Sequence, residues 1–214
     1  MNSSLQQEIE AAICTYPGLE KFEQEGIQGL TGELSFIASV EGKETITASY
    51  EIAIFLPILY PDELPKVFSK GHKLDERFEH VNQDGSFCLA VPVEERKLYD
   101  IDPTLLGFIN NLVVPFLYGY SYFLKYGKHP FGERTHGNNG VLDFYQELFG
   151  SNDIRKIILT LYKFSISGYK PHESCPCGSG AKVLRCHKLQ VKELLKNRAL
   201  LQQDLARFID RGTE

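Results

Sequence analysis

Two stretches of the chain alternate apolar and polar residues with a period of two, which is the pattern of a half-buried β-strand. In the first stretch the apolar positions are Leu34, Phe36, Ala38 and Val40. In the second they are Ile46, Ala48, Tyr50, Ile52, Ile54 and Leu56. Gly42 and Lys43 between the two stretches predict a tight antiparallel connection. A shorter strand over residues 66–69 would complete a meander.

Apolar residues recur with helical spacing on either side of this predicted sheet. A first helix is expected to end near Thr15, before a Tyr-Pro-Gly sequence, and Cys14 within it is interpreted as a small buried side chain. Asp102 followed by Pro103 is typical of a helix start, with Asp102 as the cap. Helices are predicted over residues 103–126, 140–149 and 152–165. The sequence therefore predicts an α+β fold with an antiparallel sheet.

One segment, residues 103–124, has no charged residue and is long enough to span a bilayer. Asn110 and Asn111 lie near its middle, however, and Pro115 and Gly119 interrupt it. We therefore expect a buried, bent helix or two abutting helices here in place of a membrane span.

The C-terminal part of the chain has a different character. Residues 168–174 read as a linker, and residues 188–210 predict one long charged helix. Its apolar stripe is Leu189, Leu194, Leu195, Leu201, Leu205, Phe208 and Ile209. We accordingly expect three parts: a domain over 1–167, a linker and cysteine-rich knuckle over 168–187, and a helix over 188–214. Such a long helix needs a surface to lie on, which leaves dimerisation open.

The composition, 43% hydrophobic and 24% charged, is that of a soluble globular protein. A formal net charge of −5 argues against general nucleic-acid binding, which needs a basic face. The first residues have no basic start and include two glutamates, so they do not resemble a secretory signal and a cytoplasmic location is expected.

Three of the five cysteines lie within residues 175–186, a spacing that favours metal binding over disulfides in a reducing compartment. Cys175, Cys177, Cys186 and His187 form a C-x-C-x8-C-H pattern. These four soft ligands are enough for a closed tetrahedral Zn²⁺ site, and a site with no open position has a structural role.

This segment resembles the zinc-binding motif at the C-terminus of the SecA translocation ATPase, which also occurs as an appendage on unrelated bacterial proteins. The resemblance implies a bacterial source and a docking role for the knuckle. The alternative is that the metal only stabilises the tail.

A hydrophobic strand, a Pro-rich segment and a Gly-containing turn lead to the isolated Cys88. This region resembles the centre of a ubiquitin-conjugating enzyme, in which the cysteine carries the modifier as a thioester. The matching residues are Leu56, Pro57, Tyr60, Pro61, Pro65, His80, Asn82, Asp84, Gly85 and Cys88. The resemblance implies a ubiquitin-conjugating-like fold and a cysteine-dependent transferase. Residues 91–96 replace a tryptophan-containing loop of the eukaryotic family, and the chain has no tryptophan.

The resemblance also assigns roles around the thiol. Asn82 is the expected hydrogen-bond donor to the oxyanion, although it lies six residues before Cys88 and the family's asparagine usually lies eight before. His80 is expected in the same loop, as a structural brace or as an acid or base. His136 lies in the glycine-rich stretch 127–140, which either folds over the thioester with His136 as a base or simply connects two helices.

Divergent bacterial relatives of this kind sit beside defence genes, including cyclic-nucleotide antiphage (CBASS-like) systems. The donor would then be a ubiquitin-like modifier or the C-terminus of a cGAS-like nucleotidyltransferase, and a separate activating enzyme would consume ATP. The chain has no Gly-rich or Walker-type phosphate-binding sequence of its own. Two alternatives remain: an inert binding protein that docks partners through its knuckle and tail helix, and a cysteine hydrolase with His80 or His136 as base.

Overall fold

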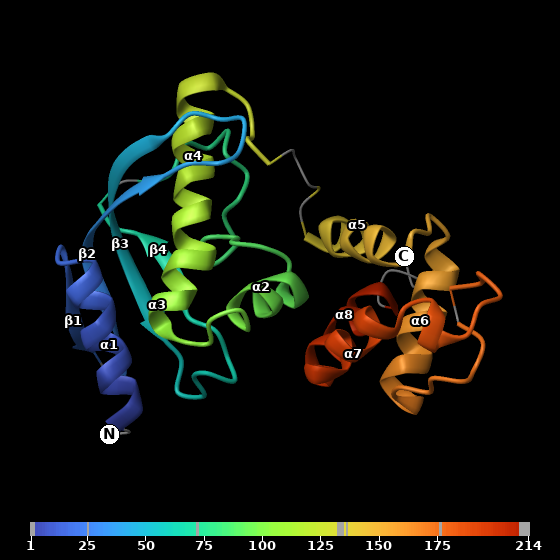
Figure 1. Ribbon diagram of the computed structural model, residues 1–214. Helices are drawn as coiled ribbons and strands as arrows, with labels where there is room; N and C mark the ends of the chain where they lie inside the picture. Colours follow the sequence, from blue (N-terminus) through green and yellow to red (C-terminus); the bar gives the residue numbers. More distant parts are fainter. Residues whose placement is uncertain are drawn as a thin grey trace. The chain divides into compact units, whose positions relative to one another are not determined.

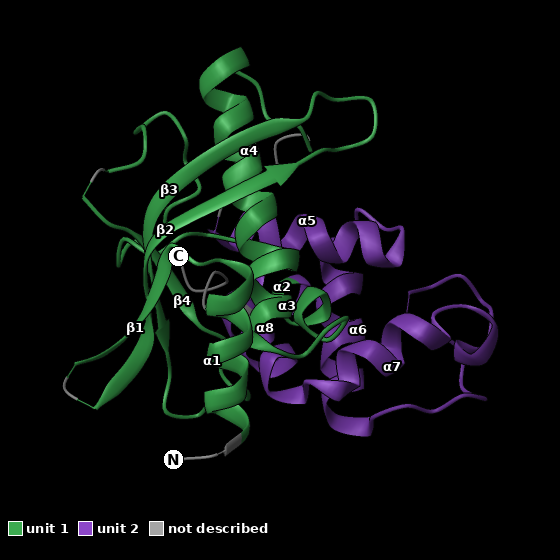
Figure 2. Ribbon diagram, turned by 60° about the vertical axis from the view of Figure 1, so that its left-hand side comes forward, with its two compact units in different colours: residues 1–90, 95–133 green, residues 91–94, 134–214 purple. Residues whose placement is uncertain are grey.

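The computed structural model describes residues 3–24, 26–71, 73–131, 135, 137–175 and 177–209. The chain forms two compact units, each with its own hydrophobic core (Figure 2). Unit 1 comprises residues 1–90 and 95–133, and unit 2 comprises residues 91–94 and 134–214. Cys88 therefore belongs to unit 1, and the cysteine-rich knuckle belongs to unit 2.

Unit 1 is built on a four-stranded antiparallel sheet with the strand order β1-β2-β3-β4 (Figure 1). The register pairs Leu34 with Tyr50 and Phe36 with Ala48, so the apolar positions of the two long strands share one face. This confirms the two predicted strands, their antiparallel connection and the shorter fourth strand. The strands are β1 (Leu19–Gln24), β2 (Ile27–Ala38), β3 (Ile46–Leu56) and β4 (Lys66–Ser69).

The sequence pattern did not predict β1, because its alternating positions carry charged and polar residues that resemble a loop. In the structure β1 is the edge strand, paired with β2, and only Leu19 of its six residues is fully buried. The Phe22 ring packs edge-on against Phe55 with centroids 5.0 Å apart, over a position that Gly29 leaves open. An edge strand of this charged composition is protected from pairing with other chains.

Helices cover the apolar face of the sheet. The helix α4 (Val114–Tyr126) packs along β2 and β3, and α1 (Ser3–Thr15) packs against β1 and against α3 (Leu105–Phe108). The side chains with almost no exposed surface at this layer include Leu34, Ile52, Ile54, Leu105 and Leu117. Burying each such side chain contributes about 1.5–3 kcal/mol, so this layer gives the loops beside it a firm support.

The uncharged segment 103–124 forms a helix that changes its winding. A π-helical turn (Ile109–Val113) joins α3 to α4, directly before Pro115. A proline has no N–H to donate and crowds the carbonyl four residues earlier, and a wider turn relieves this conflict. The expected bent helix is thus present. In the described part of the chain, no helix combines the length and apolarity that crossing a membrane requires.

Two local predictions in unit 1 were wrong. The expected cap, Asp102, accepts a hydrogen bond from the Thr104 hydroxyl, and it is Thr104 whose side chain accepts from the Gly107 N–H and begins α3. Cys14 is exposed, because it lies on the outer side of α1, opposite the buried Ile9 and Ala12. Residues 91–96, which replace the tryptophan-containing loop of the eukaryotic family, lead into the short helix α2 (Pro92–Tyr99), for which no prediction was made.

Unit 2 is helical, with α5 (Gly137–Phe149), α6 (Ile154–Ser167), α7 (Lys188–Lys196) and α8 (Arg198–Ile209). These helices share one core with the knuckle, which includes Tyr145, Leu161, Val183, Val191 and Leu201. The division of the chain therefore falls between residues 133 and 134, and differs from the expected boundary after residue 167. The reason is that α5 and α6 bury their apolar faces against the tail and not against the sheet.

The expected single tail helix is two helices that meet at Asn197, whose φ of −119° and ψ of 62° are not helical. The break lets α8 fold back, so that Leu194 and Leu201 enter the same core. Leu189, expected on the apolar stripe, is 74% exposed. The apolar stripe alone did not reveal the break, because Asn lowers helix propensity only slightly.

Candidate cysteine site and metal centre

Cys88 ends a small hairpin that lies beside the sheet. An isolated bridge pairs Val81 with Phe87, and the Cys88 N–H donates to the His80 carbonyl at 3.0 Å. The hairpin is tied to the sheet because the Phe87 N–H donates to the Val67 carbonyl of β4 at 2.8 Å. Phe87 itself is buried and stacks on Phe116 with centroids 4.5 Å apart. The backbone of Cys88 is therefore fixed in register with His80.

The turn of this hairpin is held by a carboxylate. Asp84 accepts from the Ser86 N–H at 3.0 Å and from the Ser86 hydroxyl at 2.6 Å. Its second oxygen lies 2.6 Å from the Lys66 ammonium. The hydrogen bond from Lys66, followed by those from Ser86, holds the pKa of Asp84 well below its usual range. Gly85 has a φ of +84°, which a glycine adopts without strain.

The Asn82 side chain forms its hydrogen bonds within this loop. Its side-chain amide donates to the Ser86 hydroxyl at 3.0 Å and to the Phe87 carbonyl at 3.1 Å. A primary amide has two N–H groups, so both are engaged. The role that we expected for Asn82, donating to an oxyanion at Cys88, therefore requires it to give up one of these bonds. As the structure stands, Asn82 braces the loop that carries the thiol.

The Cys88 thiol is partly buried. Burial, and then the negative charge of Glu95, raise the pKa of Cys88 above its ordinary value. Burial also raises the pKa of Glu95, to about 7. Glu95 lies on α2, and no sequence pattern indicated a role for it. Its distance of seven residues from Cys88 gave no signal, because the helix that positions it was not predicted.

His80 belongs to a cluster of rings at the end of α4. Its ring lies 4.9 Å from that of Phe78 and 5.2 Å from that of His129, centroid to centroid. His129 also packs on Phe78 and Phe123. His129 lies in the glycine-rich stretch 127–140. His136, the residue to which we assigned a role there, lies outside the described residues.

The four knuckle residues that we expected to bind metal come together. The ligand atoms of Cys175, Cys177, Cys186 and His187 all lie within 4.8 Å of one another. The Sγ atoms of Cys177 and Cys186 are 3.6 Å apart, and His187 Nδ1 lies 3.3 Å from Cys175 Sγ. A tetrahedral site with Zn–S bonds of about 2.3 Å needs sulfur atoms about 3.8 Å apart. The donor set and spacing therefore fit a tetrahedral metal ion.

The chain folds around this cluster through two tight turns. Gly178 and Gly180 both have positive φ, and the Cys175 N–H donates to the Ala181 carbonyl at 2.7 Å. Burial lowers the pKa of His187, which favours the neutral imidazole that binds metals. The His187 ring packs edge-on against Phe149 of α5, with centroids 5.2 Å apart. The metal cluster is thus part of the packing of unit 2.

No family model matches the chain, and no curated protein matches it. Among solved structures, the chain is weakly similar to the yeast Vps23 UEV domain, crystallised in complex with a Vps27 PSDP peptide. The identity is 16% and the TM-score 0.34, and the match covers 55% of this chain and 79% of that one.

Proposed function

We propose that the protein is a cysteine-dependent conjugating transferase, in which Cys88 carries the C-terminal acyl group of another protein as a thioester. The observation that carries this proposal is the construction around Cys88. A partly exposed thiol outside the metal cluster ends a hairpin that is fixed by Asp84, Ser86 and Asn82. So much local order around one thiol suits a group that must meet a partner's acyl carbon in one geometry.

The chemistry needs two exchanges. The Cys88 sulfur attacks the carbonyl carbon of a donor thioester and forms a new C–S bond, while the donor's C–S bond breaks and its sulfur leaves as a thiol that carries the proton of Cys88. A nucleophile of the target, such as a lysine amine, then attacks the same carbon and releases the Cys88 thiol. ATP enters only where a separate activating enzyme makes the first thioester.

The raised pKa of Cys88 fits a storage role. A thiol with a high pKa is a slow leaving group, so its thioester resists water better than that of an acidic thiol. Burial and Glu95 therefore lower the reactivity of the free thiol and slow the loss of the acyl group from its thioester. The rate of acyl transfer from Cys88 then depends on the nucleophile that the target protein supplies.

For the metal we propose Zn²⁺, held by the four knuckle residues in a structural site. Bound zinc supplies folding free energy, because the unfolded tail offers no preformed site. Here it would join the knuckle to α5 through His187 and Phe149. As in the motif that it resembles, the knuckle would also dock a partner.

The wider setting of the proposal comes from the family resemblance. The protein would act in the bacterial cytoplasm, in antiphage defence, with a ubiquitin-like modifier or a cGAS-like nucleotidyltransferase as donor.

One observation favours a second candidate function, an inert binding module. Both N–H groups of the Asn82 amide are engaged, so the expected oxyanion donor is occupied. In that case Cys88 is a partly buried thiol with no catalytic role, and the function of the protein is to bind partners through the knuckle and the tail helices.

Cys14 provides an internal reference for a test, because it is exposed and outside any proposed site. The metal-loaded protein is mixed with a short Gly-Gly-terminated peptide α-thioester, and acylation of each cysteine is followed by mass spectrometry. The storage role predicts that the thioester at Cys88 outlasts the thioester at Cys14, that the long-lived adduct is lost in Cys88→Ala, and that Cys88→Ser gives a persistent ester. A Cys88 thioester that is lost as fast as the Cys14 thioester would support the binding module.

A further inference from the structure

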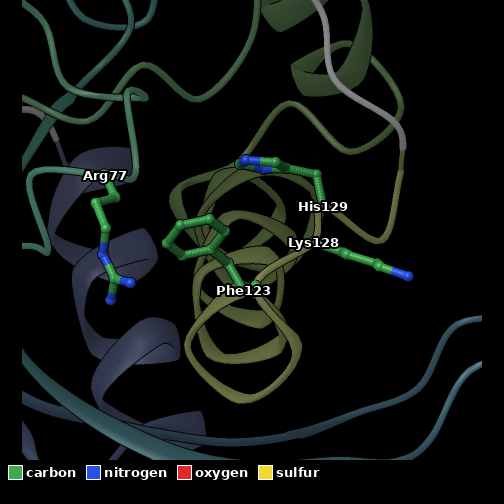
Figure 3. A pocket seen from close by; sticks show the side chains of 5 residues that line it. Arg77, Phe123, Lys128 and His129 are labelled. Atoms are coloured by element: carbon green, nitrogen blue, oxygen red, sulfur yellow. The ribbon is translucent and has the colours of Figure 1, made fainter.

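A cavity of about 320 Å³ lies in unit 1 at the C-terminal end of α4, lined by Arg77, Phe123, Gly127, Lys128 and His129 (Figure 3). Its rings belong to the aromatic cluster that contains His80. The proposed function does not use this cavity.

The Arg77 guanidinium is set in place from one side. Its Nε and Nη2 atoms donate to the two oxygens of Asp75 at 2.9 and 2.6 Å. The Asp75 N–H in turn donates to the Tyr120 hydroxyl at 3.0 Å, which ties this turn to α4. A guanidinium has five N–H groups, and Asp75 takes two of them. Within the described residues, Nη1 has no hydrogen-bond partner, so one edge of the group is left for a second carboxylate.

The rest of the cavity suits the same ligand. The Phe123 ring lies 6.0 Å from the Arg77 guanidinium and gives an apolar wall, and the His129 ring packs against it with centroids 5.0 Å apart. Lys128 also lines the cavity, and in Figure 3 its flexible side chain points outward, away from Phe123 and Arg77. The cavity therefore offers an aromatic surface with the Arg77 guanidinium on one side and a mobile cation at its edge.

Asp75 offsets the charge of Arg77, so Lys128 leaves the cavity with a net positive charge, opposite in sign to that of unit 1. Unit 1 has 10 Lys and Arg against 19 Asp and Glu, a formal net charge of −9. An acidic ligand is therefore repelled by most of unit 1, and nonspecific charge attraction does not bring it there. The Arg77 side chain is 78% exposed, so the cavity is too open to enclose a whole small molecule. It suits one side chain of a longer chain that lies across the surface.

The cavity is close in the structure to the proposed reaction centre. The His129 ring that lines it contacts the His80 ring, with centroids 5.2 Å apart. The His80 carbonyl accepts the Cys88 N–H. We propose that the cavity binds a carboxylate side chain of an acidic peptide segment in the protein that exchanges its acyl group at Cys88. The identity of this peptide as a substrate rests on the proposed function.

The probe for a test is a fluorescent peptide of alternating Gly and Glu, compared with the same peptide carrying Gln. Binding to the full-length, metal-loaded protein is measured by anisotropy at low salt and again at physiological salt. The Glu peptide is expected to bind about fivefold tighter or more, and salt weakens it. Arg77→Gln and Lys128→Gln should each reduce the affinity for the Glu peptide about two- to fivefold. Arg77→Lys should reduce it less than Arg77→Gln does.

Lys125→Gln is the matched control. Lys125 lies three residues before Lys128, has the same charge and is paired with Glu44 outside the cavity. Equal affinity for the Glu and Gln peptides would overturn the proposal, and so would a loss in Lys125→Gln as large as in Lys128→Gln. The same measurement on Cys88→Ala needs no acyl transfer, so the cavity and the proposed chemistry can fail separately.

Discussion

Glu95 and Cys88 are coupled by charge at the residue scale. Burial, followed by the Glu95 carboxylate, raises the pKa of Cys88, and burial raises the pKa of Glu95 to about 7. Above pH 7 Glu95 is charged and opposes the thiolate, and below pH 7 it is neutral and does not. Glu95→Gln should therefore speed alkylation of Cys88 by iodoacetamide at pH 8 about two- to fivefold, the effect of about 0.5–1 kcal/mol of repulsion.

The pH dependence makes this prediction specific. The advantage of Glu95→Gln over the natural protein should shrink towards pH 6, as Glu95 takes up a proton. Glu94→Gln removes a charge at the neighbouring position and should leave the rate unchanged. A gain that is the same at pH 6 and pH 8 would mean that the substitution acts through packing and not through charge.

The role of Asn82 can be determined by comparing the rate at which Cys88 is loaded with the rate at which it is discharged. If Asn82 braces the loop, Asn82→Ala removes two hydrogen bonds and destabilises unit 1 by about 1–3 kcal/mol. Loading of Cys88 from a thioester and its discharge to an amine should then slow together. If Asn82 instead leaves the loop to donate to the oxyanion, discharge falls by about 100-fold or more while loading is nearly unchanged. Single-turnover gels for both steps, with thermal melts, separate the two.

At the scale of elements, the metal cluster should control the tail. Cys175 and Val183 are buried in the same core as Val191 and Leu201, so the knuckle holds α7 and α8 to α5 and α6. We expect about one metal ion per chain, lost in Cys175→Ser combined with Cys177→Ser. Hydrogen exchange should then rise across residues 170–209 and stay unchanged in the sheet. Cys14→Ser is the control, and it should keep the full metal content.

The helices and strands also show how much of the fold and of the site can be predicted from the sequence. The strands β2 and β3 and the metal ligands were predictable, because period-two alternation and the Cys-His spacing are local patterns. The strand β1 and helix α2 were not, because both are short and their charged residues leave no clear apolar period. The role of Asn82 was expected from the family resemblance, but its hydrogen bonds to Ser86 and Phe87 depend on how the loop closes. Local pattern gives the donors, and tertiary packing decides what they touch.

At the scale of the whole molecule, the two units differ in charge as well as in core. Unit 1 has a formal net charge of −9, and unit 2, with 13 Lys and Arg against 9 Asp and Glu, has +4. The proposed chemistry lies in the acidic unit and the proposed docking element in the basic one. A partner that docks on unit 2 is therefore expected to be acidic, and its association should weaken as salt rises.

Separating the units tests this division. Because residues 1–133 contain the whole of the first core, this fragment should fold without metal, resist chelators and acylate Cys88 as fast as the full chain. Residues 134–214 should fold only with metal, and less stably than in the full chain, since Val91 and Val93 pack in their core but lie outside the fragment. Circular dichroism and denaturant melts of both fragments provide the measurement. An unfolded 1–133 fragment would mean that the cores depend on each other, and that the thiol cannot be assigned to unit 1 alone.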